Sequence, residues 1–293
     1  MQLNFKKKFV TLKKIIKFNF VNFIRIFLRI SNIYFIYFIN KNPLTNKPSK
    51  TKEFFYDLAN KTSKKIYEEI DNFELKHNFK LDKDWLDELA LLTQVTYKHS
   101  EICYAHGRIL YSSLRNRISN LNTFTNFSVF ETGTARGFSA TCMAKALEDS
   151  KVLGKIISID QLSHNKPIYW NSISDHTHGK ISRRELLNKW KNITDKYIIF
   201  LTGDSRVLTN SLNFPRVHFA FLDGFHTYDD VHIEFNVIKD CQFEGDIVVF
   251  DDYTVELYSG VVKAVNEICE KYSYSKEIVN INEKRSLLIA TKK

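Results

Sequence analysis

Five short apolar runs lie between residues 129 and 252, and segments of helical or mixed character separate them. The runs cover residues 129–131, 155–160, 197–202, 217–223 and 246–252, and four of them end on or beside an acidic residue. Nearly continuous runs of Val, Ile, Leu and Phe are typical of strands that are covered on both faces. The pattern therefore predicts an α/β fold with a Rossmann-like, doubly wound and mostly parallel sheet.

The first run leads into a turn that suits a small polar ligand. Glu131 ends the run, Gly133 and Gly137 lie four residues apart, and Ser139 stands at the start of a helix-like segment. Glycines let the backbone approach a ligand closely, and a helix start offers unpaired N–H groups. The spacing differs from the G-x-G-x-x-G of dinucleotide-binding proteins, which disfavours an α/β oxidoreductase as an alternative.

The next two runs also end in polar residues. Asp160 closes the second run, where a carboxylate is placed to accept the two hydroxyls of a ribose. Gly203, Asp204 and Ser205 stop the third run in a turn that is suited to border an adenine. These residues extend the candidate ligand site across neighbouring strands.

The fourth and fifth runs bring acidic residues to the same predicted edge. Asp223 ends one run, and Asp251 and Asp252 end the other. The carboxyl ends of parallel strands open on one edge, and carboxylate oxygens are the ligands that Mg²⁺ prefers, with Mn²⁺ and Ca²⁺ as alternatives. The competing interpretation is structural, with Asp251 and Asp252 capping a turn and Asp223 starting the next helix.

A histidine stands beside these acids. His226 follows Asp223 by three residues and precedes a helix that Thr227 and Asp230 are predicted to cap. An imidazole has an ordinary pKa of about 6.5, which suits a general base at neutral pH. His226 is therefore the candidate base, with Asp223 beside it in the candidate catalytic group.

The stretch from about residue 130 to residue 253 resembles the metal-dependent O-methyltransferases of the class I S-adenosylmethionine (SAM) superfamily, especially the bacterial sugar enzymes of the macrocin O-methyltransferase type. The resemblance implies a seven-stranded sheet, SAM as cofactor, and Mg²⁺ held by Asp223, Asp251 and Asp252. The residues implied to hold SAM are Glu131, Gly133, Thr134, Gly137, Ser139 and Asp160, and the turn at Gly203, Asp204 and Ser205 completes the predicted cofactor site.

Two departures bear on the chemistry that the resemblance implies. Catechol O-methyltransferases have an Asp-Asn pair where this chain has Asp251 and Asp252, and a catalytic lysine where it has His226. The implied reaction is a direct displacement in which the metal lowers the pKa of an acceptor hydroxyl and His226 takes its proton. The implied acceptor is a sugar, a glycan or a glycosylated metabolite. A membrane-tethered binding module without catalysis is the other alternative.

Charge along the chain separates an N-terminal arm from the rest. Residues 1–50 contain 11 Lys or Arg and no acidic residue, whereas the remainder carries 32 basic and 33 acidic residues. A balanced catalytic region does not favour nucleic acid. The mixture of cationic and apolar residues over 5–39 predicts a helix that contacts a membrane surface, against the alternatives of a signal anchor and of packing on protein. We expect a cytoplasmic protein at the inner face of the cytoplasmic membrane, and a homo-oligomer is compatible with the sequence.

The expected organisation is an arm and linker at 1–50, a helical lid region at 51–125 and a SAM-binding domain at 126–293. Residues 53–79 and 86–118 are predicted to be helical. Acceptor recognition is predicted for the insert after the second run, which contains His164, Trp170 and the Asp175–His178 segment. Side chains of the helical region are further candidates for the pocket, namely Tyr104, His106, Arg108 and Tyr111.

Overall fold

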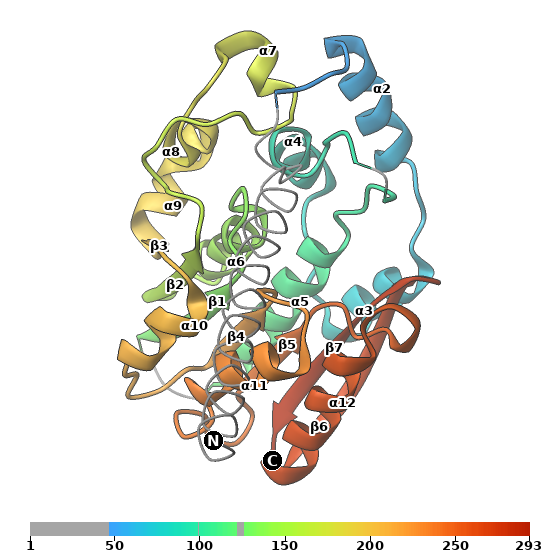
Figure 1. Ribbon diagram of the computed structural model, residues 1–293. Coiled ribbons are helices and arrows are strands. Elements are labelled where there is room, and N and C mark those ends of the chain that lie inside the picture. Colours follow the sequence, from blue (N-terminus) through green and yellow to red (C-terminus); the bar gives the residue numbers. More distant parts are fainter. Residues whose placement is uncertain (1–46, 99, 122–125) are drawn as a thin grey trace, which may run out of the picture. The chain divides into compact units, whose positions relative to one another are not determined.

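The computed structural model describes residues 47–98, 100–121 and 126–293. Figure 1 traces this part of the chain in colour. The predicted membrane-contacting arm, residues 5–39, lies outside the described residues. Within the described ranges, every helix is too short or too polar to span a membrane.

A seven-stranded sheet forms the centre of the fold, in the order β3-β2-β1-β4-β5-β7-β6. The first five strands are parallel, and β7 and β6 add an antiparallel pair at one edge. The predicted doubly wound, mostly parallel sheet is therefore confirmed. The strands are β1 (Phe127–Thr132), β2 (Gly154–Asp160), β3 (Ile198–Thr202), β4 (Phe219–Leu222), β5 (Ile247–Phe250), β6 (Tyr274–Asn282) and β7 (Arg285–Lys292).

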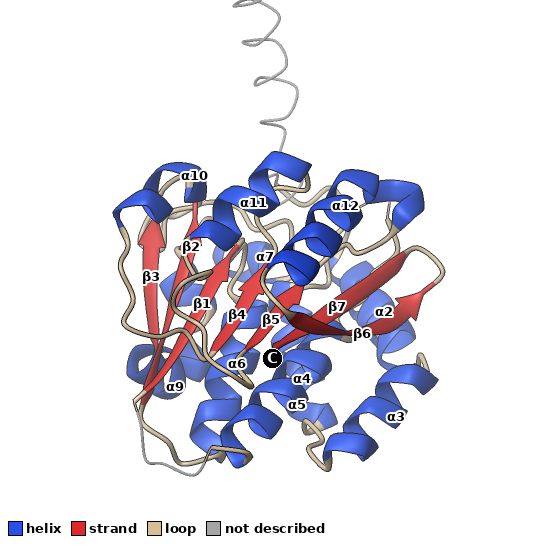
Figure 2. Cartoon of the chain, turned by 90° about the horizontal axis from the view of Figure 1, so that it is seen from below, coloured by secondary structure: helices blue, strands red, loops and turns tan. Residues whose placement is uncertain are grey.

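Helices cover both faces of the sheet, as the nearly continuous apolar strands require (Figure 2). On β4, Phe219 and Phe221 pack into one core, while Ala220 and Leu222 pack into the other. Successive strand residues point to opposite faces, so both sets are buried. The helices are α2 (Lys52–Ser63), α3 (Glu68–His77), α4 (Lys83–Thr93), α5 (His106–Ser119), α6 (Phe138–Asp149), α7 (Ser174–His178), α8 (Arg183–Leu186), α9 (Lys191–Tyr197), α10 (Ser205–Leu208), α11 (Tyr228–Asn236) and α12 (Val255–Lys271), with 3-10 turns at Asn188–Trp190 and Thr209–Ser211.

The region before β1 is helical, but its helices are shorter than the sequence pattern predicts. Lys64 ends α2, and Asn78 ends α3 in a left-handed conformation. Thr51 and Asp82 accept backbone hydrogen bonds at the starts of α2 and α4, which is how short polar side chains begin helices. Residues 47–293 form one compact unit, so these helices share a core with the sheet.

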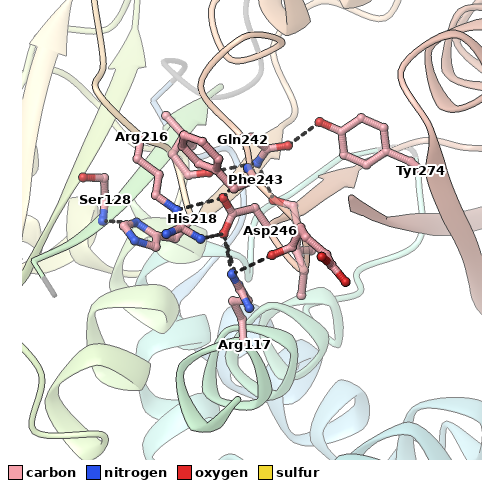
Figure 3. A network of polar contacts seen from close by, with 11 residues as sticks. Arg117, Ser128, Arg216, His218, Gln242, Phe243, Asp246 and Tyr274 are labelled. Atoms are coloured by element: carbon pink, nitrogen blue, oxygen red, sulfur yellow. Dashed lines mark hydrogen bonds and ion pairs between the residues drawn. The ribbon is translucent and has the colours of Figure 1, made fainter. Parts of the chain in front are cut away.

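A buried ion-pair network ties α5 to the sheet at the start of β5 (Figure 3). Asp246 is fully buried, and its Oδ1 accepts a hydrogen bond of 2.7 Å from Arg117 Nη2. Arg216 donates to both Asp246 oxygens at 3.0 Å, and the Phe243 N–H donates to Oδ2 at 2.8 Å. One carboxylate thus balances two guanidinium groups from segments far apart in the sequence.

Replacement of Asp246 by alanine is expected to lower the free energy of unfolding by about 3–5 kcal/mol, since it leaves two guanidinium groups without their shared buried partner. Urea unfolding followed by circular dichroism measures the change. The matched control is Glu244→Gln, because this exposed carboxyl lies two residues away. Equal stability of the Asp246→Ala protein and the wild type would show that the network contributes nothing.

Candidate active site

The candidate site lies where the strand order reverses. The chain winds from β1 to β2 and β3 on one side and resumes with β4 on the other side of β1. Backbone hydrogen bonds continue past the strand ends, from Asp223 N to Thr132 O and from Asp251 N to Leu222 O, each 3.2 Å long. The loops that follow the strands therefore start in fixed register at the edge where α/β sheets bind ligands.

The turn after β1 depends on glycine. Gly133 and Gly137 have φ of +85° and +86°, in the left-handed region that glycine adopts without strain. A Cβ on Gly133 would lie 1.8 Å from the Asp223 carbonyl oxygen, so the β1 turn and the end of β4 pack backbone to backbone. Ala135 also has a positive φ, of +46°, and its N–H donates to Asp160 Oδ2 at 2.7 Å.

Glu131 lies at the end of β1 with an unused acceptor. The side chain is fully buried, and Oε2 accepts a hydrogen bond from the Ser158 hydroxyl. Oε1 has no hydrogen-bond partner among the described residues. Burial raises the pKa of Glu131 to about 7, against the lowering effect of the Ser139 and Ser158 hydroxyls. A buried oxygen without a partner beside a glycine turn fits a donor group brought by a ligand, such as the ammonium of SAM.

Thr134 lies within this turn and Asp160 lies beside it, and part of the hydrogen-bonding capacity of both side chains is used internally. Asp160 Oδ1 accepts the Leu162 N–H at 2.6 Å, and Thr134 Oγ1 lies 2.5 Å from Ser158 Oγ. Arg183 Nη2 lies 3.8 Å from Asp160 Oδ1, and Arg183 Nε donates to the Ala135 carbonyl. The buried guanidinium of Arg183, which the sequence pattern did not indicate, therefore holds the turn against the strand.

The turn after β3 is also held internally. Asp204 begins α10 by accepting the Arg206 N–H, and Ser205 donates to Glu234 Oε1 at 3.0 Å. Thr132 donates to the other oxygen, Glu234 Oε2, at 2.7 Å. Burial raises the pKa of Glu234 to about 7. Glu234 thus braces the ends of β1 and β3, a role that sequence reasoning missed because the residue lies in an ordinary helix.

The three aspartates after β4 and β5 lie together, and a cation from β7 lies among them. Arg285 Nε donates to Asp251 Oδ1 at 3.2 Å, and Arg285 Nη2 donates to Asp251 Oδ2. Burial alone would raise the pKa of Asp251, but Arg285 outweighs it and holds that pKa at about 2. Burial and the neighbouring Asp251 raise the pKa of Asp223 well above its ordinary value, and the same two causes raise that of Asp252.

The expected magnesium site is not confirmed by these contacts. No group of three or more Asp, Glu, His or Cys side chains in the described part of the chain has a geometry that would hold a metal ion. The physical reason is Arg285, because its guanidinium occupies both oxygens of Asp251. The acidic residues Asp223, Asp251 and Asp252 converge at one edge, but as they stand they do not fit a shared divalent cation.

His226 and Asp252 form a pair at the mouth of this site. His226 Nδ1 lies 3.3 Å from Asp252 Oδ2, and the imidazole side chain is 37% exposed. The Tyr258 ring lies 5.1 Å from the imidazole, at a kink of α12 where Tyr258 has non-helical φ and ψ. Thr227 caps α11 by accepting the Asp230 N–H, as predicted, which fixes the chain just after His226.

In the described part of the chain, few side chains of the insert after β2 and of the helices before β1 are available to bind a ligand at this site. Trp170 is fully buried, and Asp175 accepts its N–H, so this part of the insert is core and cannot stack on an acceptor. Among the candidates of the helical region, only His106 lies near Asp251. Burial and the nearby Arg285 lower its pKa to about 3. The others bond to acidic residues of other elements, namely Tyr104 to Asp87, Arg108 to Asp71 and Glu74, and Tyr111 to Asp149.

Comparisons with known proteins agree with this fold. Residues 130–253 match the family model of a methyltransferase domain. The O-methyltransferase NovP is 16% identical, with a TM-score of 0.51 over 71% of this chain and 98% of that chain. The O-methyltransferase TomG from Streptomyces achromogenes is 14% identical, with a TM-score of 0.51 over 73% of this chain and 92% of that chain. No curated protein sequence gives a significant match.

The family model and the two structures confirm part of what the sequence resemblance implied. The predicted class I methyltransferase fold is confirmed, and residues 130–253 are similar to a methyltransferase domain. The structural likeness concerns the fold, and the acceptor and the metal dependence belong to the proposals below.

Replacement of Gly133 by alanine is expected to destabilise the protein and to abolish SAM binding. The new methyl group meets the Asp223 carbonyl, and the left-handed backbone adds strain of about 1–2 kcal/mol. Gly179→Ala is the matched control, because Gly179 also has a positive φ but open space around its Cβ. Urea unfolding and calorimetry with SAM compare the two variants. Similar losses in both would mean that the close approach of β1 and β4 is unimportant.

Proposed function

We propose that this methyltransferase uses SAM to methylate a hydroxyl group of a sugar, a glycan or a glycosylated metabolite. The observation that carries the proposal is the pair formed by His226 and Asp252, 3.3 Å apart at the carboxyl edge of the sheet. Transfer of a methyl group to a hydroxyl needs a base for the hydroxyl proton. An exposed imidazole held by a carboxylate supplies that base.

The cofactor proposal rests on the residues around the β1 turn. Glu131 offers the buried, unpaired Oε1 to the ammonium of the cofactor, and the turn at Gly133 and Gly137 gives its backbone room. Asp160 is the proposed ribose ligand, and the turn at Gly203 is proposed to border the adenine. When bound, SAM supplies an activated methyl group on a sulfonium sulfur.

His226 and Asp252 have different proposed roles at the acceptor hydroxyl. The Asp252 carboxylate lies 3.3 Å from Nδ1 and favours a proton on that nitrogen, so Nε2 is the nitrogen that takes the hydroxyl proton. As the acceptor oxygen forms its bond to the methyl carbon, the bond from that carbon to sulfur breaks and His226 keeps the hydroxyl proton. No protein group forms a covalent bond to either reactant, which suits a direct displacement.

A groove beside the acidic edge supports a polyhydroxylated acceptor. The groove has a volume of about 630 Å³ and begins at Tyr253 and Thr254, directly after Asp251 and Asp252. Its lining combines aromatic rings with carboxylate, amide and hydroxyl groups, a mixture that orients sugars through stacking and hydrogen bonds. The lining includes Tyr67, Tyr253, Thr254, Asn280, Asn282, Glu283 and Ser286. This groove replaces the insert after β2 as the proposed acceptor site.

The acceptor is sought by incubating the protein with SAM labelled in its methyl group and with cell-envelope and metabolite fractions. We expect label in a sugar-containing product that is stable to base, as an ether is. Label found only in protein or in a base-labile ester would overturn the acceptor class and leave the methyltransferase assignment intact.

His226→Gln is expected to lower kcat by about 10²–10⁴-fold, the usual contribution of a general base, while SAM binding is unchanged. The matched control is His232→Gln. His232 of α11 pairs with Glu267 of α12 and lies outside the proposed site. Rates with the labelled product and calorimetry with SAM give the two readouts. Full activity of His226→Gln would remove the proposed base.

SAM binding at pH 6 is expected to release about one proton. Glu131, with a pKa of about 7, is mostly protonated in the free protein, and a bound ammonium favours its carboxylate. Calorimetry in two buffers with different ionisation enthalpies counts the proton. Glu131→Gln should lose the release, whereas Glu234→Gln should keep it, because Glu234 has a similar pKa but bonds to Thr132 and Ser205. Equal release from all three proteins would exclude Glu131 as the ammonium partner.

A further inference from the structure

We propose that Arg285 supplies the positive charge at the acceptor hydroxyl, so that methyl transfer needs no divalent metal ion. The inference rests on the proposed function, since it concerns the same hydroxyl that His226 deprotonates. Arg285 is the first residue of β7, and it stands among Asp223, Asp251 and Asp252.

The position of the guanidinium is built into the sheet. β7 runs antiparallel to β5, with Leu288 opposite Phe250, so its first residues lie at the edge where β5 ends. The hydrogen bond from Tyr253 N to Ser286 O, 3.0 Å long, extends this pairing to the residue next to Arg285. An arginine at the start of β7 therefore reaches the aspartates that follow β5.

A metal ion that displaced Arg285 from Asp251 would have to overcome a large free-energy cost. Two parallel N–H bonds join the groups, and the Asp251 side chain is only 3% exposed. Separation of a buried pair leaves an uncompensated charge, which costs several kcal/mol. A cation that used Asp251 as a ligand would have to compete with this arrangement.

Arg285 keeps capacity for a substrate oxygen. Its Nε and Nη2 bond to Asp251, whereas Nη1 has no hydrogen-bond partner in the part of the chain that the structure describes. The side chain is 22% exposed, so an acceptor can reach it. A fixed N–H donor lowers the pKa of a bound hydroxyl and stabilises negative charge that develops on its oxygen.

A titration with Mn²⁺ alone, followed by electron paramagnetic resonance, tests this without knowledge of the acceptor. We expect no site in the wild type up to about 1 mM ion, because the guanidinium holds Asp251. Removal of the guanidinium in Arg285→Met should create a site, with affinity at least about tenfold higher. One tightly held ion per wild-type chain would overturn the proposal.

The catalytic consequence is measured on the product of the labelling experiment. A chelator should leave the wild-type rate unchanged, and Arg285→Met should lose about 10²–10³-fold in kcat/KM, as expected for removal of a fixed donor. Loss of wild-type activity on chelation, restored by Mg²⁺, would overturn the proposal. Lys284→Met is the control, because this exposed cation is the preceding residue.

Two further measurements separate the other causes of failure. If Arg285→Met does not fold, the pair of substitutions Arg285→Met and Asp251→Asn removes both charges together, and unchanged chelator resistance of the wild type still supports the proposal. Calorimetry with SAM on the same samples judges the proposed function by itself. A wild type that binds neither SAM nor Mn²⁺ would contradict the proposed function, whereas one that binds both would contradict only the role of Arg285.

Discussion

The crowding of carboxylates at one edge of the sheet is the constraint on which the site depends. Parallel strands deliver Asp223, Asp251 and Asp252 to the same place because their carboxyl ends coincide. Neighbouring carboxyl groups cannot all stay ionised unless cations lie between them. The protein meets the constraint with Arg285 on Asp251 and with a raised pKa for Asp223. The electrostatics of the active edge are therefore set by the antiparallel strand as much as by the parallel ones.

The loops around the proposed cofactor site are held before any ligand arrives. Glu234 joins the ends of β1 and β3 through Thr132 and Ser205, and a Cβ on Gly224 would lie 1.9 Å from its carboxylate. Arg183 holds the β1 turn from the other side. A site built in this way loses little conformational entropy on binding, which favours affinity and accurate placement of the methyl group.

The sequence was informative where the chemistry is local and silent where it depends on long-range pairing. The apolar runs predicted the parallel strands, and the spacing of Glu131, Gly133 and Gly137 predicted the turn after β1. Arg285 follows a polar hairpin and precedes an ordinary apolar strand, so nothing near it indicates a partner 34 residues away. Trp170 misled for the opposite reason, since an aromatic residue in a polar insert resembles a ligand-stacking group until burial is known.

Neighbouring aspartates serve different partners because the backbone turns between them. Asp252 has a φ of +52°, a conformation that costs a residue with a Cβ about 1–3 kcal/mol and that is concentrated at functional sites. In a continuing strand Asp251 and Asp252 would point to opposite faces of the sheet. The left-handed residue instead lets Asp251 bond to Arg285 while Asp252 lies beside His226 at the mouth of the site. The strained backbone at Asp252 thus allows the two carboxylates different roles. Asp251 fixes the position of the Arg285 guanidinium, and Asp252 orients His226.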